Sequence, residues 1–216
     1  MPGIRLVTFD ILHTLITPRH PIHVQYSMAF APYLGKLDPE QLKYSFKIAL
    51  KELQRERPAY AYENEAASER WWSEVIKKTA LGAGAAPSAV DASLEKIVPN
   101  LMKRFSSREG YAAFEDALPT IRRLQERKIF TAIVSNSDSR SRLALKDLGF
   151  PEYMTPIVLS EEEGIEKPNQ EIFQRALNKV NEMHKVEIQK HECLHVGDEL
   201  ECDYEGAVNA GMEGLV

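Results

Sequence analysis

The sequence has only two cysteines and no apolar run long enough to cross a membrane. Cys193 and Cys202 form neither a CxxC motif nor a secreted disulfide framework, so we expect reduced thiols and no metal–thiolate site. The first residues enter a strand-like segment directly, without the basic and apolar regions of a signal peptide. These absences predict a cytoplasmic protein that does not enter a membrane.

The sequence also has fewer positively charged than negatively charged residues. Lysine and arginine total 27 against 32 aspartates and glutamates, which gives a formal net charge of -5. Such a chain has no general attraction to nucleic acids or anionic membranes, and we expect neither as a partner. Its 216 residues suffice for one domain, or for one domain that carries a substantial insert.

The sequence does contain several short apolar runs that are typical of buried parallel strands. They lie at residues 4–9, 130–134, 156–159 and 193–196, with a candidate fifth strand at 214–216. Helical patterns at residues 141–148 and 168–183 alternate with the later runs. The alternation predicts an α/β fold with a doubly wound, Rossmann-like parallel sheet.

A long segment without such strands separates the first run from the second. Residues 17–110 show amphipathic helical stretches instead, including 39–56 and 63–80, and the segment is too long for a crossover. We therefore expect an α/β core of residues 1–16 and 111–216 with an inserted helical cap of residues 17–110. The candidates for a separate cap core are Tyr44, Phe46, Trp71, Trp72, Leu101 and Phe105.

The chain stops at the candidate fifth strand without a helix to cover that edge of the sheet. This predicts either a truncated chain or coverage by a neighbouring molecule, so a homo-oligomer stays open as a partner.

Polar residues of complementary chemistry follow the predicted strands. They are Asp10, Ser135 with Asn136, Lys167, and Asp198 with Asp203. The carboxyl ends of parallel strands meet at one edge of an open sheet, where such folds place their ligands. A reactive carboxylate, a hydroxyl donor, a cation and acidic ligands for magnesium are the groups that phosphoryl transfer requires.

The order of these residues resembles the motifs of the haloacid dehalogenase-like hydrolase superfamily, and the sequence looks most like its eukaryotic haloacid dehalogenase-like hydrolase domain-containing members. The four motifs are Asp-x-x-x-Thr at 10–14, Ile-Val-Ser-Asn at 133–136, Gly-Ile-Glu-Lys-Pro at 164–168 and Gly-Asp-x-x-x-x-Asp at 197–203. Each motif is weak alone, whereas their order makes a chance agreement remote. The resemblance also identifies the insert with the helical cap of the family.

The resemblance implies a magnesium-dependent phosphomonoesterase that acts on a small phosphorylated molecule. Asp10 would attack phosphorus and form an aspartyl-phosphate, and Thr14 would support the loop that carries it. Ser135 and Asn136 would contact the phosphoryl oxygens, and Lys167 would neutralise them. An anionic nucleophile approaches an anionic phosphate only if cations screen their repulsion, so these roles are physically consistent.

The resemblance also implies a set of magnesium ligands. Asp10 and Asp198 would bind the ion through their carboxylates, and Leu12 would bind it through its backbone carbonyl. Asp203 would either join them directly or orient Lys167 and a metal-bound water.

One position departs from the family pattern. Family phosphatases carry a second aspartate two residues beyond the nucleophile, where it protonates the leaving group, and this sequence has Leu12 there. General acid–base catalysis contributes about 10²–10⁴ in rate, so the leucine predicts a slow or altered enzyme. His13 is the nearest titratable group, and the unperturbed pKa of a histidine, about 6.5, would suit proton transfer, but its offset of one residue in a tight turn disfavours this role.

Several alternatives remain open at the level of sequence. The loss of the acid–base residue also fits a non-catalytic protein that binds a ligand or partner with the retained pocket. A dehalogenase is disfavoured because the acidic pair at residues 198 and 203 would repel a haloacid anion. A phosphonatase would need a cap lysine that the sequence does not single out. His195, inside the fourth apolar run, is expected to be a buried, hydrogen-bonded core residue rather than a ligand.

Overall fold

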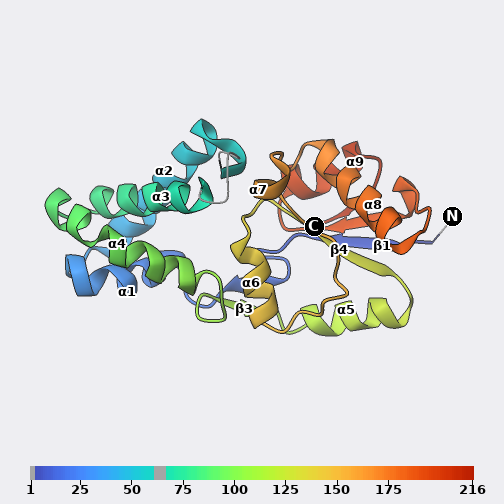
Figure 1. Ribbon diagram of the computed structural model, residues 1–216, viewed down its shortest axis with the longest axis horizontal. Coiled ribbons are helices and arrows are strands. Elements are labelled where there is room, and N and C mark those ends of the chain that lie inside the picture. The colour runs from blue at the N-terminus through green and yellow to red at the C-terminus, as the bar shows by residue number, and fades with distance from the viewer. Residues whose placement is uncertain (1–2, 61–66) are drawn as a thin grey trace. The chain divides into compact units, whose positions relative to one another are not determined.

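The computed structural model describes residues 3–60 and 67–216, and the chain divides into two compact units, shown in Figure 1. One unit comprises Met1–Thr17 and Ala112–Val216, and the other comprises Pro18–Tyr111. The boundaries expected from the sequence, 16/17 and 110/111, each lie one residue away. Each unit has a hydrophobic core of its own.

The first unit is built on a five-stranded parallel sheet. Its strands are β1 Leu6–Phe9, β4 Phe130–Ser135, β5 Ile157–Leu159, β6 Cys193–Val196 and β7 Glu213–Leu215. Their order is β5-β4-β1-β6-β7, so β1 lies at the centre and the chain winds away from it in both directions. This order confirms the predicted doubly wound α/β fold, including the candidate fifth strand.

Helices cover both faces of this sheet. They are α5 Ala117–Glu126, α6 Arg140–Asp147, α7 Ser160–Glu163, α8 Gln170–His184 and α9 Gly206–Asn209. Figure 1 shows α8 and α9 on one side of the sheet and α5 and α6 on the other. Helix α8 starts two residues later than expected because the Asn169 side chain caps it, accepting a hydrogen bond from the Glu171 N–H at 2.9 Å.

The buried face of α8 explains how the sheet is held in place. Ile172, Phe173, Ala176, Leu177 and Val180 recur at helical spacing and are all buried. Because side chains alternate along a strand, Leu6 of β1 and Ala132 and Val134 of β4 lie on one face of the sheet, and they form one apolar cluster with this helix face. The helix therefore fixes the strands whose carboxyl ends carry the candidate site.

The second unit is helical in its described part. Its helices are α1 Ile22–Leu34, α2 Pro39–Glu56, α3 Ala67–Gly82 and α4 Pro87–Arg104, with a short 3₁₀ turn at Pro58–Tyr60. Helix α2 begins where Asp38 accepts a hydrogen bond from the Gln41 N–H at 2.9 Å and proline occupies the first helical turn. The expected start of the next helix at residue 63 lies outside the described residues.

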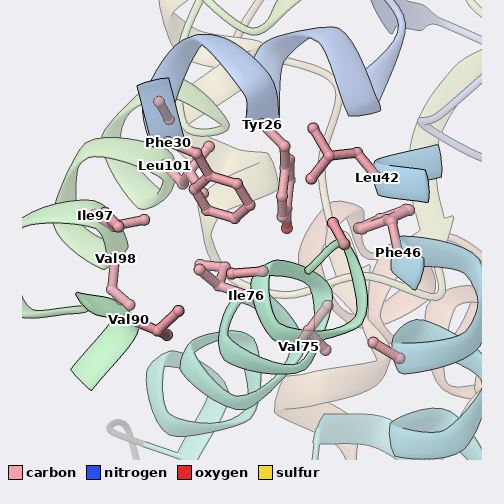
Figure 2. Packing of buried hydrophobic residues seen from close by; sticks show 14 of the residues in the cluster. Tyr26, Phe30, Leu42, Phe46, Val75, Ile76, Val90, Ile97, Val98 and Leu101 are labelled. Carbon is pink, nitrogen blue, oxygen red and sulfur yellow. The ribbon is translucent and has the colours of Figure 1, made fainter. Parts of the chain in front are cut away.

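These helices pack around a core of aromatic and aliphatic side chains, which Figure 2 shows from close by. Phe46, Trp71, Leu101 and Phe105 belong to this core, as predicted, and Trp72 packs against it. The prediction was wrong for Tyr44, which is 65% exposed. The buried residues of α2 include positions 42, 46, 49 and 53, so position 44 falls on the opposite face of the helix.

Two short strands were missed at the level of sequence. Strands β2 Ile16–Pro18 and β3 Tyr111–Ala113 pair where the chain leaves the first unit and returns to it. Their three-residue length is too short to produce a recognisable period. Among the described residues, no helix is both long enough and apolar enough to cross a membrane.

The packing in Figure 2 predicts which residues of α2 support the second unit. Leu42→Ala removes a fully buried side chain and should lower the free energy of unfolding by about 2–5 kcal/mol, because the cavity cannot close completely. Tyr44→Ala is the matched control on the same helix and should change stability by less than about 0.5 kcal/mol. Equilibrium urea unfolding followed by fluorescence measures both, since the only two tryptophans, at positions 71 and 72, lie in this unit. Equal losses in both variants would contradict the packing.

Candidate active site

The candidate site lies at the carboxyl edge of the parallel sheet. Asp10 directly follows β1, Ser135 ends β4, and Asp198 follows β6 after a glycine. The N–H of Asp10 still donates to the Val196 carbonyl at 2.9 Å, so the β1–β6 ladder holds the backbone of this carboxylate. Side chains from three neighbouring strand ends therefore reach one edge of the sheet.

Lys167 is the centre of the cluster. Its Nζ donates to Asp10 Oδ1 at 2.8 Å and to Asp203 Oδ1 at 2.5 Å, and the residue is only 3% exposed. Burial opposes the charged form, but the charges of the two carboxylates outweigh it, so the pKa of Lys167 is raised. The ammonium therefore stays protonated between the two aspartates.

Asn136 fixes the backbone of this lysine. Its Nδ2 donates to the Lys167 carbonyl at 2.9 Å, and its Oδ1 accepts from the Lys167 N–H at 2.7 Å. Both ends of the amide are thus directed at Lys167. The arrangement makes Asn136 a support for the lysine, and its expected contact with a phosphoryl group stays a prediction.

Asp203 is the most enclosed carboxylate of the cluster, at 1% exposed. Its Oδ1 accepts from Lys167 and from His195 Nε2 at 2.9 Å, and its Oδ2 accepts the N–H groups of Asp198 and Glu199 at 3.0 Å each. Burial raises its pKa, but the hydrogen bond from His195 and the charge of Lys167 prevail and hold it well below its usual range. All four acceptor positions of this carboxylate are occupied.

Gly197 is required by this packing. A Cβ at this position would lie 2.0 Å from Asp203 Cγ, far inside van der Waals contact. The Gly-Asp sequence after β6 therefore has a steric reason, since only glycine lets the Asp203 carboxylate lie against the backbone of the preceding turn.

Three carboxylates of the site form a group that could hold a cation. Asp10, Asp198 and Asp203 each offer a carboxylate oxygen, and the three oxygens lie within 4.8 Å of one another. The pKa of Asp198 is raised by partial burial and by the negative charge of Asp10, with an opposing contribution from His13. Hard oxygen donors of this kind suit a divalent ion such as magnesium. Because Asp203 is already saturated, the other two carboxylates are the more available ligands.

The loop after Asp10 folds into a tight turn. The N–H groups of Leu15 and Ile16 both donate to the Ile11 carbonyl, at 2.9 and 3.0 Å. His13 occupies the left-handed region with φ +62° and is exposed. Leu12, half-buried at the position of the missing aspartate, brings no titratable group to this turn.

Two further predicted residues lie near these strand ends, but in the described part of the chain their side chains do not join the ion-pair network. Ser135 is buried at the end of β4, one strand from Asp10. The Thr14 hydroxyl is buried in the loop after β1 and has no hydrogen-bond partner among the described residues. Their roles toward a substrate stay predictions.

Thr8 and His195 belong to the network, although sequence reasoning gave them no part in it. The expectation that His195 is buried and hydrogen-bonded is confirmed, with Thr8 Oγ1 at 2.8 Å from Nδ1 and Asp203 at Nε2. The sequence signal that could have revealed this pair is a single polar residue inside each of two apolar strands, Thr8 in β1 and His195 in β6. That pairing becomes visible only once β1 and β6 are known to be adjacent.

The first unit has a doubly wound parallel sheet with a lysine-bridged acidic cluster at its carboxyl edge, and a helical unit is inserted after its first strand. These features define the class of Rossmann-like proteins with a cap insertion and an acidic site. Within that class the chain belongs to the haloacid dehalogenase-like hydrolase family, whose sequence profile matches residues 4–211. The resemblance carried by the four motifs is thereby confirmed.

Known proteins resemble this chain over nearly its whole length. Haloacid dehalogenase-like hydrolase domain-containing protein 3 of Bos taurus is 30% identical over 213 residues, which cover 99% of this chain and 81% of the relative. YfnB of Bacillus subtilis, assigned to the same hydrolase group and solved bound to magnesium, matches with a TM-score of 0.68 at 21% identity, over 98% of this chain and 87% of YfnB.

A dehalogenase shares the same fold. The L-2-haloacid dehalogenase of Xanthobacter autotrophicus matches with a TM-score of 0.66 at 17% identity, over 98% of this chain and 76% of that protein. Similarity at this level of identity establishes the fold, and the chemistry has to be argued from the site.

The buried ion pair predicts a large effect of removing the lysine. Lys167→Met leaves the carboxylates of Asp10 and Asp203 buried without their cation, which should cost about 3–5 kcal/mol of unfolding free energy. Lys179→Met is the control, because Lys179 is exposed and its pair with Glu163 should contribute at most about 1 kcal/mol. Urea unfolding in metal-free buffer measures the difference, and similar losses in the two variants would refute the central place of Lys167.

Proposed function

We propose that this protein is a magnesium-dependent phosphomonoesterase that acts slowly on a small phosphorylated metabolite through an aspartyl-phosphate on Asp10. The observation that carries the proposal is the position of Asp10 at the carboxyl edge of the sheet, between the ammonium of Lys167 and the carboxylate of Asp198. A nucleophilic carboxylate needs positive charge beside it before it can approach a phosphate.

In the proposed reaction a carboxylate oxygen of Asp10 attacks phosphorus while the bond from phosphorus to the ester oxygen breaks. Lys167 and the hydroxyl of Ser135 stabilise the negative charge on the phosphoryl oxygens, and Asn136 holds the lysine in place. Water then attacks the phosphorus of the aspartyl-phosphate. This second step releases inorganic phosphate and restores the carboxylate of Asp10.

The charge of the site supports a divalent cation. The three carboxylates and the one ammonium of the cluster leave two formal negative charges when all are ionised. Asp10, Asp198 and the backbone carbonyl of Leu12 would hold magnesium, which when bound neutralises charge on the phosphate. Asp203 would act by orienting Lys167, since its own acceptor positions are filled. The same excess of negative charge disfavours a haloacid anion as substrate when no cation is bound.

Metal removal and loss of the nucleophile give the direct test. A screen of phosphorylated metabolites should detect phosphate release with magnesium and none after chelation, and Asp10→Asn should reduce turnover by at least about 10³-fold. Asp116→Asn, an exposed aspartate of the same unit, is the control and should keep full activity. Turnover that persists without metal, or in Asp10→Asn, would argue against the proposal.

A ligand-binding protein without turnover is the second candidate, and Leu12 is the observation that favours it. The leucine side chain cannot protonate the leaving group, so that proton would have to come from another residue or from water. A protein of this kind would retain the charged pocket for recognition and dispense with catalysis.

Restoring the acid separates the two candidates. Leu12→Asp should raise the hydrolysis rate by about 10²-fold or more if only the acid–base step has been lost. Leu12→Asn matches the new side chain in size but cannot transfer a proton, so it should give no comparable gain. Steady-state kinetics on the best substrate of the screen measures both, and an unchanged rate in Leu12→Asp favours the binding function.

A further inference from the structure

A buried polar pair lies directly beneath the candidate site. Thr8 on β1 and His195 on β6 are opposite each other in the parallel register, and they are 1% and 0% exposed. Their neighbours two residues earlier, Leu6 and Cys193, belong to the apolar cluster under α8. The polar pair therefore separates the apolar core from the charged residues that follow both strands.

The two ring nitrogens of His195 have different partners. Nε2 lies 2.9 Å from Asp203 Oδ1, and Nδ1 lies 2.8 Å from Thr8 Oγ1. Because an ionised carboxylate can only accept, Nε2 must carry a hydrogen. Burial of the ring disfavours its doubly protonated form, so Nδ1 is bare and accepts the hydrogen of the Thr8 hydroxyl. Asp203 therefore selects the tautomer, and the Thr8 hydroxyl holds the ring by donating to the bare Nδ1.

The ring of His195 also has a fixed orientation. Phe173 on α8 meets it edge-on, with the ring centroids 5.0 Å apart and the planes at 82°. A rotated imidazole would place both nitrogens away from their partners in a site without water access. The packing and the two hydrogen bonds thus select the same orientation.

The hydrogen bonds continue from this histidine to the proposed nucleophile. Asp203 Oδ1 is shared between His195 and Lys167, and Lys167 donates in turn to Asp10 Oδ1. Without the histidine N–H, Asp203 Oδ1 would be held by the lysine alone. The two backbone N–H groups at Oδ2 would still hold one side of the carboxylate, but Oδ1 and the ammonium could shift together, away from Asp10.

We propose that His195, protonated at Nε2 opposite Asp203 and held in place by the Thr8 hydroxyl at Nδ1, is a positioning residue that fixes Asp203 and through it the Lys167 ammonium beside Asp10. The catalytic consequence rests on the proposed function, whereas the tautomer and the position of Lys167 do not. Substitutions at Thr8 and His195, which are not catalytic residues, should therefore alter the geometry of the site.

Nuclear magnetic resonance tests the positioning without any assay of activity. In the ¹⁵N-labelled protein, His195 should show a protonated Nε2 and a bare Nδ1, with its signals assigned by their loss in His195→Gln. Thr8→Val should alter these signals and shift the ammonium signal of Lys167. Thr131→Val is the matched control, since Thr131 is a buried threonine on the adjacent strand β4 whose hydroxyl has no partner among the described residues.

The spectra decide the proposal in either direction. Signals altered in Thr8→Val and unaltered in Thr131→Val support it. A His195 ring protonated at Nδ1, or a Lys167 signal that is unchanged in both Thr8→Val and His195→Leu, would overturn it. These spectra can be interpreted even if the protein hydrolyses no phosphate ester. A failure of the proposed function would appear in the metabolite screen and not in the spectra.

Kinetics extends the test where phosphatase activity is found. His195→Leu should lower kcat by about 10-fold or more, the usual scale for groups that orient a catalytic residue, with KM changed less than about 2-fold. His195→Gln keeps an N–H donor of similar reach and should recover most of the loss. If the glutamine variant is no better than the leucine variant at equal thermal stability, the hydrogen bond to Asp203 is not what matters.

Discussion

The ammonium of Lys167, buried between two carboxylates, is the interaction on which the first unit of this protein depends. Removing such a charge from water costs several kcal/mol, and it is tolerated only when opposite charges and well-placed hydrogen bonds compensate it. Asp10 and Asp203 supply the charge, and Asn136 ties the backbone of the lysine from two sides. Segments from the start, the middle and the end of the chain thus become interdependent.

The two sides of this ion pair differ in a way that bears on function. On the Asp203 side every acceptor position is filled by the lysine, by His195 and by two backbone N–H groups, so the carboxylate is rigid and fully satisfied. On the other side Asp10 and Asp198 bring two negative charges together with less compensation. The Asp203 side, with its hydrogen bonds satisfied, holds the geometry, and the Asp10–Asp198 side, with uncompensated charge, attracts a cation. A site for an anionic substrate is expected to combine these two properties.

Much of this architecture could be predicted from the sequence because it follows from local pattern. Apolar runs of strand length alternate with helical spacing, and this alternation predicted the doubly wound sheet. The prediction was wrong where periodicity was not applied residue by residue, as for Tyr44, which lies opposite the buried face of α2. It also missed β2 and β3, whose pairing is three residues long and joins distant parts of the chain.

The sequence by itself determined which chemical groups are present and in what order they follow the strands, because residue type and spacing survive without any knowledge of packing. It also determined that Leu12 replaces an acid. Only the tertiary structure decided which polar atoms have hydrogen-bond partners. It showed that Asn136 holds Lys167, that Asp203 has no acceptor position left, and that His195 donates to Asp203. Hydrogen bonds are made at about 3 Å, and distances of that kind between remote segments exist only after the strands have paired and the helices have packed over them.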